Sequence, residues 1–433
     1  MSASVLARLA PSFELSCPRC HESLVYDDIH FVGMPILIAC HCSQCHVAYL
    51  LDWPAGHALL HPTIVEVESG AAHFDGREWY PRLLERLIAS RKHPTAAPID
   101  VRGLGSGGST VIVVNCIDFL YGHCVLKILS GLRYSRDADA DVVMIVQQNV
   151  SWLVPSTVDI VIEVDVPLSD GDSWIAGLDS AVMSVLESYE TVQIAPTPSQ
   201  PQLTAEDLAQ IAPRLGPSAF WDSPKAGPDQ ISFILREDRL WSGGHVPTHL
   251  RLLPRGLRHR RMVRAQTRRF ANVVRQVQRH VPDAQFVAIG LGRSHRLPTS
   301  IRDLRTTKIT QDDERTWLAE YARSRVVIGV HGSHMLLPSA FAGAVVDLLP
   351  PRKLSNIAQD LIVTGSTESE PKLNLFRYRI LPDSVGADVV SEVIVSLLED
   401  ADFHYVNMIR NRSATGANWL RPIVWRRLDD PAG

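Results

Sequence analysis

The first sixty residues contain two Cys-x-x-Cys pairs with the spacing of a metal site. Cys17 and Cys20 form the first pair, and Cys42 and Cys45 form the second, with 21 residues between the pairs. Two thiolates at this spacing lie on one tight turn, so two such turns supply four soft ligands to one tetrahedral zinc ion. Cys40 is close enough to replace Cys42, but the matched spacing favours Cys42. The sequence therefore predicts a structural Zn²⁺ site.

Short apolar runs around these cysteines predict three strands, at 24–26, 35–39 and 47–51. Together with the cysteine pairs they resemble a zinc ribbon over about residues 13–52, and we assign 1–65 to this module. The alternative, two redox-active pairs, lacks the βαβ context of a thioredoxin. The module is expected to be a structural clip or interaction module. It has few cations, so nucleic-acid binding is the weaker interpretation.

A second chemical signal is the turn His331-Gly332-Ser333, which follows an apolar run at 326–330 and precedes a helix that begins near His334. Gly332 permits close backbone approach, and the free N–H groups of a helix start attract anions, above all a diphosphate. The alternative is a buried turn with packed histidines. We expect the four residues of the turn and helix start to bind a diphosphate.

Two arginines follow another predicted strand, at 231–235. Arg236 stands at its carboxyl end, and Arg239 comes within one further turn. Guanidinium groups match phosphate oxygens geometrically, so both are candidates for neutralising a bound phosphate. A surface network with Glu237 and Asp238 is the alternative, and these acids are expected to orient the arginines.

The elements that must position these residues form two series of alternating strands and helices. Continuous β-branched runs separated by helices are typical of buried parallel strands. The predicted strands are 111–114, 142–146, 160–164, 192–195, 231–235, 285–289, 326–330, 344–348 and 377–381, and the predicted helices are 119–132, 173–188, 258–280, 312–323 and 385–398. The fold class is therefore α/β, with two Rossmann-like domains that face a cleft. In such sheets, ligands bind beyond the carboxyl ends of the strands.

Residues 231–350 resemble the C-terminal half of glycosyltransferase family sixty-one and related GT-B enzymes. The resemblance rests on the His-Gly-Ser turn, the short helix with Phe341, and the segment Gly343-Ala-Val-Val-Asp-Leu-Leu-Pro350. It implies a GT-B fold, transfer that requires no metal, and a nucleotide-sugar donor whose diphosphate is lined by His331, Gly332 and Ser333. His334 and Met335 depart from the family pattern, as does the zinc ribbon, and the acceptor is not identified.

The resemblance also implies a base near the acceptor, because transfer to a hydroxyl group needs a proton acceptor. Asp118 and His123 follow the first strand of the N-terminal half and are the candidates for the catalytic base. The alternatives are that Asp118 caps the helix and that His123 is a packed helix residue.

These patterns divide the chain into six parts. They are a zinc ribbon at 1–65, a helical connector at 66–100, an N-terminal Rossmann-like acceptor domain at 101–200, a linker at 201–229, a C-terminal Rossmann-like nucleotide-sugar domain at 230–400, and a tail at 401–433 that packs back across the two halves. The linker is predicted from its Pro, Gln, Ser and Gly content.

Composition excludes a disordered or fibrous protein, since 45% of the 433 residues are hydrophobic. The net charge of −4 excludes a polycation, but residues 251–280 contain ten arginines and no acid. A non-catalytic protein that binds nucleic acid or a protein partner through this basic helix is therefore the alternative function. Neither a Walker motif nor a correctly placed G-x-G-x-x-G is present. No signal peptide or membrane span is evident, so we expect a cytoplasmic protein.

Overall fold

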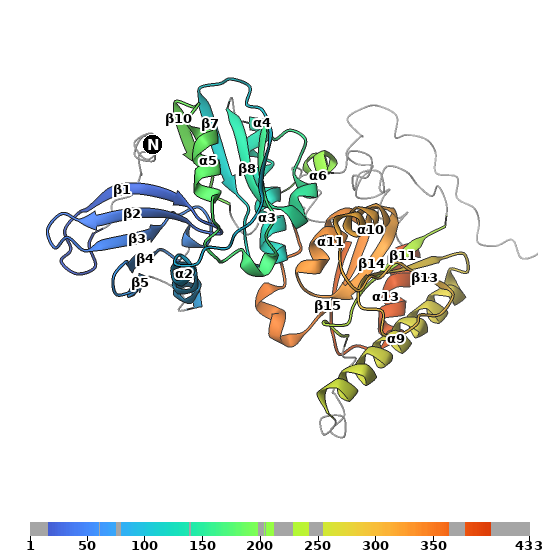
Figure 1. Cartoon of the computed structure of the whole chain (residues 1–433). Helices are drawn as coiled ribbons and strands as arrows, with labels where there is room; N and C mark the ends of the chain where they lie inside the picture. The colour runs from blue at the N-terminus through green and yellow to red at the C-terminus, as the bar shows by residue number, and fades with distance from the viewer. Residues whose placement is uncertain are drawn as a thin grey trace, which may run out of the picture.

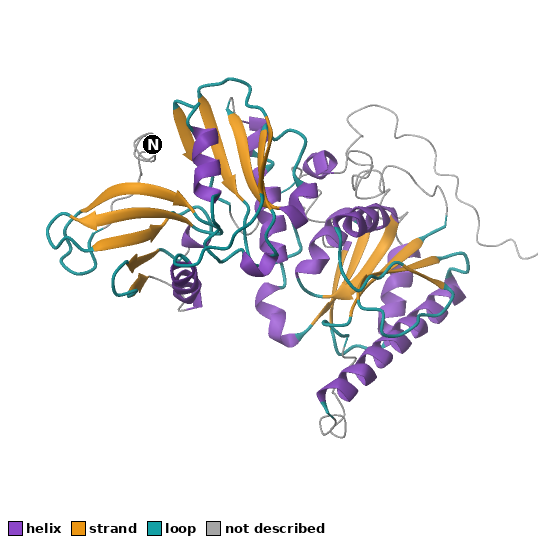
Figure 2. Ribbon diagram, viewed as in Figure 1, coloured by secondary structure: helices purple, strands orange, loops and turns teal. Residues whose placement is uncertain are grey.

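The computed structural model describes residues 16–59, 61–74, 79–137, 140–197, 203, 205–211, 228–241, 254–362 and 377–399. Three β-sheets lie side by side in chain order (Figure 1), and helices cover the second and third sheets (Figure 2). The predicted tail 401–433 lies outside the described residues, as does most of the predicted linker 201–229. A helix, α6 (Ala205–Ile211), lies within that linker.

The N-terminal module is a five-stranded antiparallel sheet with strands in chain order. Its elements are β1 (Leu24–Phe31), β2 (Ile36–Cys42), β3 (Ala48–Asp52), η1 (His57–Leu59), β4 (Thr63–Glu66), β5 (Ala72–Phe74) and the following helix α2 (Trp79–Ser90). The first three strands are those that the sequence predicts. β4 and β5 were not predicted because they have only four and three residues. The sheet therefore extends into the predicted connector 66–100.

The second sheet has the order β10-β7-β8-β9-β6, and all its strands are parallel except β6 at the edge. Its elements are β6 (Ile99–Gly103), β7 (Thr110–Asn115), α3 (Tyr121–Gly131), α4 (Tyr134–Asp137), β8 (Asp141–Gln147), η2 (Gln148–Leu153), β9 (Ile160–Val164), η3 (Leu168–Asp170), α5 (Leu178–Leu186) and β10 (Thr191–Ile194). The four predicted strands are confirmed. The sequence does not predict β6, because it is an exposed edge strand without an apolar run.

The third sheet has six strands in the order β13-β12-β11-β14-β15-β16, all parallel. Its elements are β11 (Gln230–Arg236), α9 (Arg255–His280), β12 (Gln285–Leu291), β13 (Ile301–Asp303), α10 (Gln311–Arg323), β14 (Ser324–Val330), η4 (Ser333–Met335), α11 (Leu336–Phe341), β15 (Ala344–Leu349), η5 (Pro351–Asn356), β16 (Tyr378–Pro382) and α13 (Ala387–Glu399). The five predicted strands and three predicted helices of this half are confirmed, whereas the three-residue β13 was not predicted.

One apolar core joins the second and third sheets. Leu126 and Leu129 of α3 belong to the same buried cluster as Leu336 and Phe341 of α11. The N-terminal sheet shares a second cluster with the second sheet, since Phe31 is buried together with Val113. Burial of this kind supplies most of the free energy that holds such layers together. The three sheets are thus bound to one another by shared cores.

The basic helix α9 presents a buried apolar stripe to the third sheet. Val263, Phe270, Val273, Val274 and Val277 are all buried, as its spacing predicts. The arginines of α9 lie outside this stripe, and whether they bind nucleic acid stays a prediction. Among the described residues, no helix combines the length and the apolar character needed to cross a bilayer.

Candidate functional site

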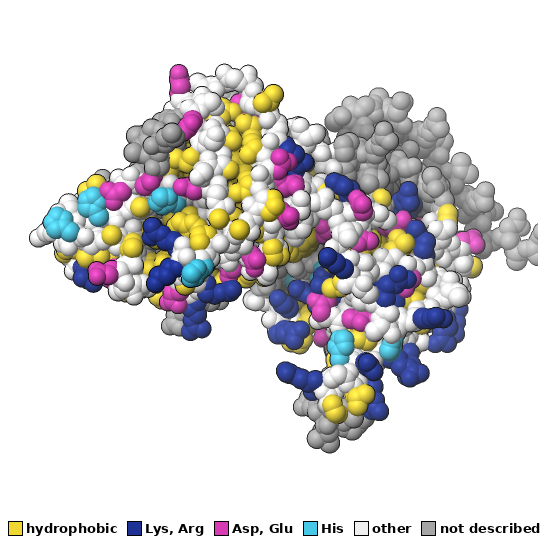
Figure 3. All heavy atoms as spheres, viewed as in Figure 1, with side chains coloured by type: hydrophobic (Ala, Val, Ile, Leu, Met, Phe, Trp, Pro, Cys, Tyr) yellow, Lys and Arg dark blue, Asp and Glu magenta, His cyan; other side chains and the backbone are white. Residues whose placement is uncertain are grey.

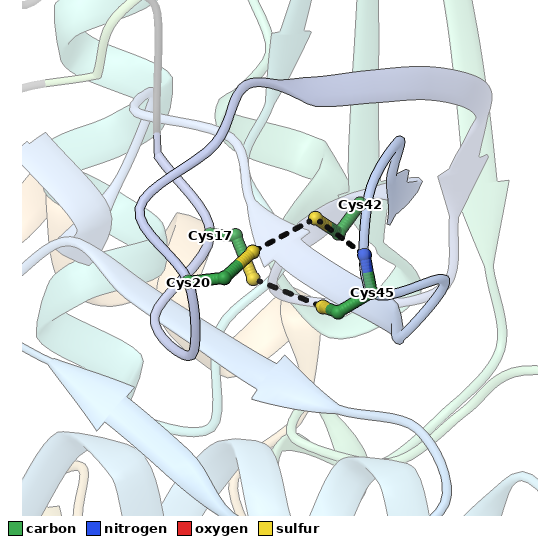
Figure 4. Close-up of side chains that lie close together, drawn as sticks. All are labelled: Cys17, Cys20, Cys42 and Cys45. Atoms are coloured by element: carbon green, nitrogen blue, oxygen red, sulfur yellow. Dashed lines mark hydrogen bonds between the residues drawn. The ribbon is translucent and has the colours of Figure 1, made fainter.

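The four predicted cysteines come together in the N-terminal module (Figure 4). The Sγ atoms of Cys17 and Cys45 are 3.6 Å apart, those of Cys20 and Cys42 are 3.3 Å apart, and all four lie within 4.8 Å of one another. Buried Cys40 stands outside this cluster, and burial raises the pKa of its thiol to about 12. The cluster therefore fits one tetrahedral ion and selects Cys42 over Cys40.

The two Cys-x-x-Cys turns have the same backbone geometry. The amide of His21 donates to the carbonyl of Cys17 at 2.9 Å, and the amide of His46 donates to that of Cys42 at 3.1 Å. Both histidines have a positive φ, of 63° and 57°, which is uncommon for residues other than glycine. Neither histidine belongs to the cluster. Two matched turns therefore aim two thiols each at one point between them.

Zinc content tests this cluster. The protein should contain about one Zn²⁺ per chain, and Cys20→Ser should lose it because a structural site needs all four ligands. Cys40→Ser removes a thiol of the same sheet that lies outside the cluster, and this control should keep the metal. Mass-spectrometric metal analysis of the purified variants measures both. Equal zinc loss in the two variants, or a metal-free parent protein, would contradict the assignment.

Asp118 lies just after β7, at the buried centre of an ionic cluster. Its carboxylate is wholly buried and lies 3.0 Å from Nζ of Lys127, 3.3 Å from Nδ1 of His123 and 3.6 Å from Nε2 of His57. Burial opposes ionisation, but Lys127 and the two imidazoles outweigh it and hold the pKa of Asp118 well below its usual range. Asp118 is therefore an ionised partner that orients its neighbours and is inaccessible to a substrate.

The His-Gly-Ser turn is filled by neighbouring side chains. His331 is buried, with Nδ1 2.5 Å from a carboxylate oxygen of Asp347 and Nε2 2.9 Å from the carbonyl oxygen of Asn356. A Cβ atom on Gly332 would lie 1.8 Å from the guanidinium group of Arg239, so that group covers the glycine. A Cβ atom on Gly122 of α3 would lie 2.5 Å from Cβ of Ser333.

These contacts are those of a packed turn, and diphosphate binding by His331, Gly332 and Ser333 stays a prediction. Both nitrogens of His331 are used within the fold, and the other two residues pack against Arg239 and α3. The buried-turn alternative describes the structure better. The sequence could not show this, since Asp347 and Asn356 follow His331 by 16 and 25 residues.

A cavity of about 660 Å³ lies between the second and third sheets. From the second sheet, Gln148 follows β8, and Asp165 to Leu168 follow β9. From the third sheet, Arg236 ends β11 and Gly290 lies near the end of β12, while His334 follows β14. The cavity thus lies where the carboxyl ends of two parallel sheets meet, the usual ligand site of such sheets.

The predicted site residues do not all lie in the same cavity. Arg236 and His334 line this cavity, whereas Arg239 and His331 line a second cavity on the α9 side of the third sheet. Asp118 and His123 do not line the interdomain cavity, although we expected both to face it. Tyr121, at the start of the same helix as His123, does line it, and a catalytic role of Asp118 or His123 stays a prediction.

The charged side chains that line the cavity are the cations Arg236 and Lys308 and the acids Asp165 and Glu314, beside one neutral imidazole. Arg236 donates two hydrogen bonds of 2.8 Å to Asp238, and Lys308 lines the same wall. Burial, together with Arg236 and Arg239, holds the pKa of His334 well below its usual value, so its ring is neutral. Neither ring nitrogen finds a hydrogen-bond partner in the described part of the chain. His334 can therefore both donate to a ligand and accept from it.

Glu314 is a candidate functional residue that the sequence analysis did not identify. It lies in the first turn of α10, next to Asp313, which forms a capping box with Thr310. Nε1 of Trp152 donates to its carboxylate at 2.8 Å, and burial raises the pKa of Glu314. A signal was available, because Glu314 precedes the buried residues Trp317 and Leu318 by three and four positions and so shares their face.

Comparison with known proteins gave only distant matches. No family model matches the chain, and no curated protein does. Among solved structures, ADP-heptose lps heptosyltransferase II of E. coli has a TM-score of 0.36 at 12% identity and covers 68% of this chain and 99% of its own. A family 9 glycosyl transferase from Veillonella parvula has a TM-score of 0.38 at 10% identity, covering 69% and 100%. Overlaps of this size do not establish a shared fold or activity.

Proposed function

We propose that this chain is a glycosyltransferase that binds a nucleotide-sugar donor in the interdomain cavity and transfers the sugar to an acceptor. The observation that supports this most is the position of that cavity. It lies at the carboxyl ends of two parallel sheets at once, and its volume of about 660 Å³ is in the range of small-molecule sites. The resemblance of residues 231–350 to GT-B enzymes points the same way.

The third sheet supplies the groups that would hold the donor. Arg236 and Lys308 are the cations on the cavity wall. They would stabilise the nucleoside diphosphate as it leaves the anomeric carbon with the electron pair of the broken bond. His334, neutral and without an internal partner among the described residues, would donate N–H to a phosphate or sugar oxygen. Asp238 fixes the direction of Arg236 through two hydrogen bonds.

Glu314 replaces Asp118 and His123 as the proposed base. In the transfer, the bond between the anomeric carbon and the phosphate oxygen breaks, and the acceptor oxygen bonds to that carbon. The proton of the acceptor hydroxyl passes to the Glu314 carboxylate. A raised pKa suits this role, because a carboxylate whose conjugate acid has a pKa closer to neutral pH is a stronger base. The carboxylate lines the cavity, whereas Asp118 is sealed from it.

The zinc module would act on structure alone in this scheme. Cys17, Cys20, Cys42 and Cys45 would hold a Zn²⁺ ion, which supplies folding free energy to a small module. No acceptor or donor group is assigned to this metal. The cluster belongs to the N-terminal module, whose sheet lies on the opposite side of the second sheet from the third sheet (Figure 1).

Calorimetric titration with nucleoside diphosphates tests the donor site. We expect at least one of the uridine, guanosine and adenosine diphosphates to bind, and Arg236→Ala to weaken it about tenfold or more, because a hydrogen bond to a charged phosphate is lost. Arg293→Ala is the control, since this exposed arginine lies outside the cavity lining. Absence of binding, or equal affinity in parent and Arg236→Ala, would count against the donor site.

A further inference from the structure

A second cavity of about 1010 Å³ opens on the α9 side of the third sheet and shares no lining residue with the interdomain cavity. We call it the basic groove. It is formed by the segment after β11, the first turns of α9 and the segment after β15. Its basic lining residues are Arg239, Arg255, Arg258, Arg352 and Lys353, beside the imidazoles of His259 and His331 and the acids Glu237, Asp238 and Asp383.

All three acids already take part in interactions, and for two of them the partner lies outside the groove. Asp238 accepts two hydrogen bonds from Arg236, which belongs to the other cavity. Glu237 accepts from the backbone amide and the hydroxyl of Ser294, at 2.7 and 2.8 Å. Within the described ranges, no carboxylate forms an ion pair with Arg239, Arg255, Arg258 or Arg352. The groove therefore has an excess of positive charge that the fold does not neutralise.

Part of this positive charge lies at the N-terminal end of α9, where the helix dipole disfavours cations. Arg255 and Arg258 occupy the first turn of α9, which contains no acidic residue, and the positive end of a helix dipole repels cations. Arg239 is half-buried, and burial together with nearby Arg236 and Arg352 lowers its pKa. Five Arg and Lys side chains line this hollow against three acids, and such an excess of cations is what an anion site requires. Lys and Arg side chains gather around the lower part of α9 in Figure 3.

We propose that the basic groove binds a ligand that presents two or more phosphate groups, separately from any donor in the interdomain cavity. Arginine forks at Arg239, Arg258 and Arg352 would each take phosphate oxygens, a pairing that their planar geometry favours. Binding at this groove does not require that the interdomain cavity bind a nucleotide sugar, so the two assignments can fail independently.

The phosphates can come from a soluble diphosphate or from a lipid headgroup. Leu257 and Leu354, next in sequence to groove residues, are 52% and 61% exposed. Apolar side chains beside arginines suit an anionic bilayer surface as well as a phosphate. The shared chemistry is clustered phosphate, and two experimental arms separate its sources.

The first arm is calorimetric titration of the full chain with inorganic pyrophosphate. Arg258→Gln and Arg352→Gln should each weaken binding about tenfold or more. Arg279→Gln should leave it unchanged, because this exposed arginine lies on the same helix roughly 31 Å along the axis from Arg258.

The second arm is co-sedimentation with phosphatidylglycerol vesicles and with phosphatidylcholine vesicles. A lipid source predicts binding to the anionic vesicles alone, lost in Arg258→Gln, Arg352→Gln and Leu354→Ser. A soluble source predicts pyrophosphate binding without sedimentation. Absence of binding in both arms, or binding that the groove variants leave unchanged, would each overturn the proposal. All the substituted groove residues are exposed or half-buried, and thermal unfolding confirms that the variants fold.

Discussion

Replacing Glu314 by glutamine should lower donor turnover by about 10²–10⁴-fold, the usual contribution of a positioned base. Glutamine keeps the size of the side chain and still accepts the hydrogen bond from Trp152, so the cavity should keep its shape. Affinity for the nucleoside diphosphate should change little, because Glu314 is assigned to the acceptor proton and not to the phosphates. Steady-state rates and calorimetric titration of the same variant separate the two effects.

The pH profile provides a second readout for Glu314. Burial raises the pKa of its carboxyl group, and a base acts only when deprotonated. Turnover should therefore rise as pH increases through this raised pKa and level off above it. In Glu314→Gln this rise should disappear. An unchanged profile, or a variant as fast as the parent, would remove Glu314 from the mechanism.

Replacing Lys127 by methionine should destabilise the fold by about 3–5 kcal/mol, the range found when one partner of a buried ion pair is removed. Lys127 is nearly inaccessible, and its loss leaves the fully buried carboxylate of Asp118 with two imidazoles and the backbone amide of Leu120 as partners. Urea unfolding measures the change. The matched control is Arg102→Met, which breaks an ion pair with Glu163 whose arginine is 52% exposed, and it should cost no more than about 1 kcal/mol.

The pH dependence of stability follows from the same cluster. The folded pKa of Asp118 is depressed, so its stabilising contribution is fully present above the unfolded pKa of about 3.9 and is lost as pH falls toward the folded pKa. The parent should lose this contribution on acidification, and Lys127→Met should lose much less. Equal destabilisation in Lys127→Met and the Arg102 control would contradict the buried-pair account.

The strands with the clearest sequence signal are those buried on both faces. Residues 142–146 of β8 and 326–330 of β14 are buried runs without a polar side chain, so their sequence alone marks them as parallel core strands. The missed strands have no such run: Ile99–Gly103 is an exposed edge, and Ile301–Asp303 has only one buried residue. Short or exposed strands depend on neighbours that are distant in sequence, which local patterns do not encode.

The sequence predicts site residues best where the residues that bind one ligand are close together in the chain. Cys17 and Cys20 share one turn, so their spacing alone indicates a metal cluster. Arg236 and Arg239 are also close in sequence, yet they line different cavities, because the chain turns after β11. His331 bonds to residues of η5 and β15 that no local pattern connects to it. Side-chain direction after a strand end depends on the tertiary fold.

Incubation of the purified chain with a panel of nucleotide sugars, read by mass spectrometry for released nucleoside diphosphate, tests the central assignment most directly. Even without an acceptor, a site that binds the donor and activates a hydroxyl group should hydrolyse its own nucleotide sugar slowly, and Glu314→Gln should not. A folded parent that consumes no nucleotide sugar and binds no nucleoside diphosphate would contradict the assignment of the interdomain cavity to sugar transfer.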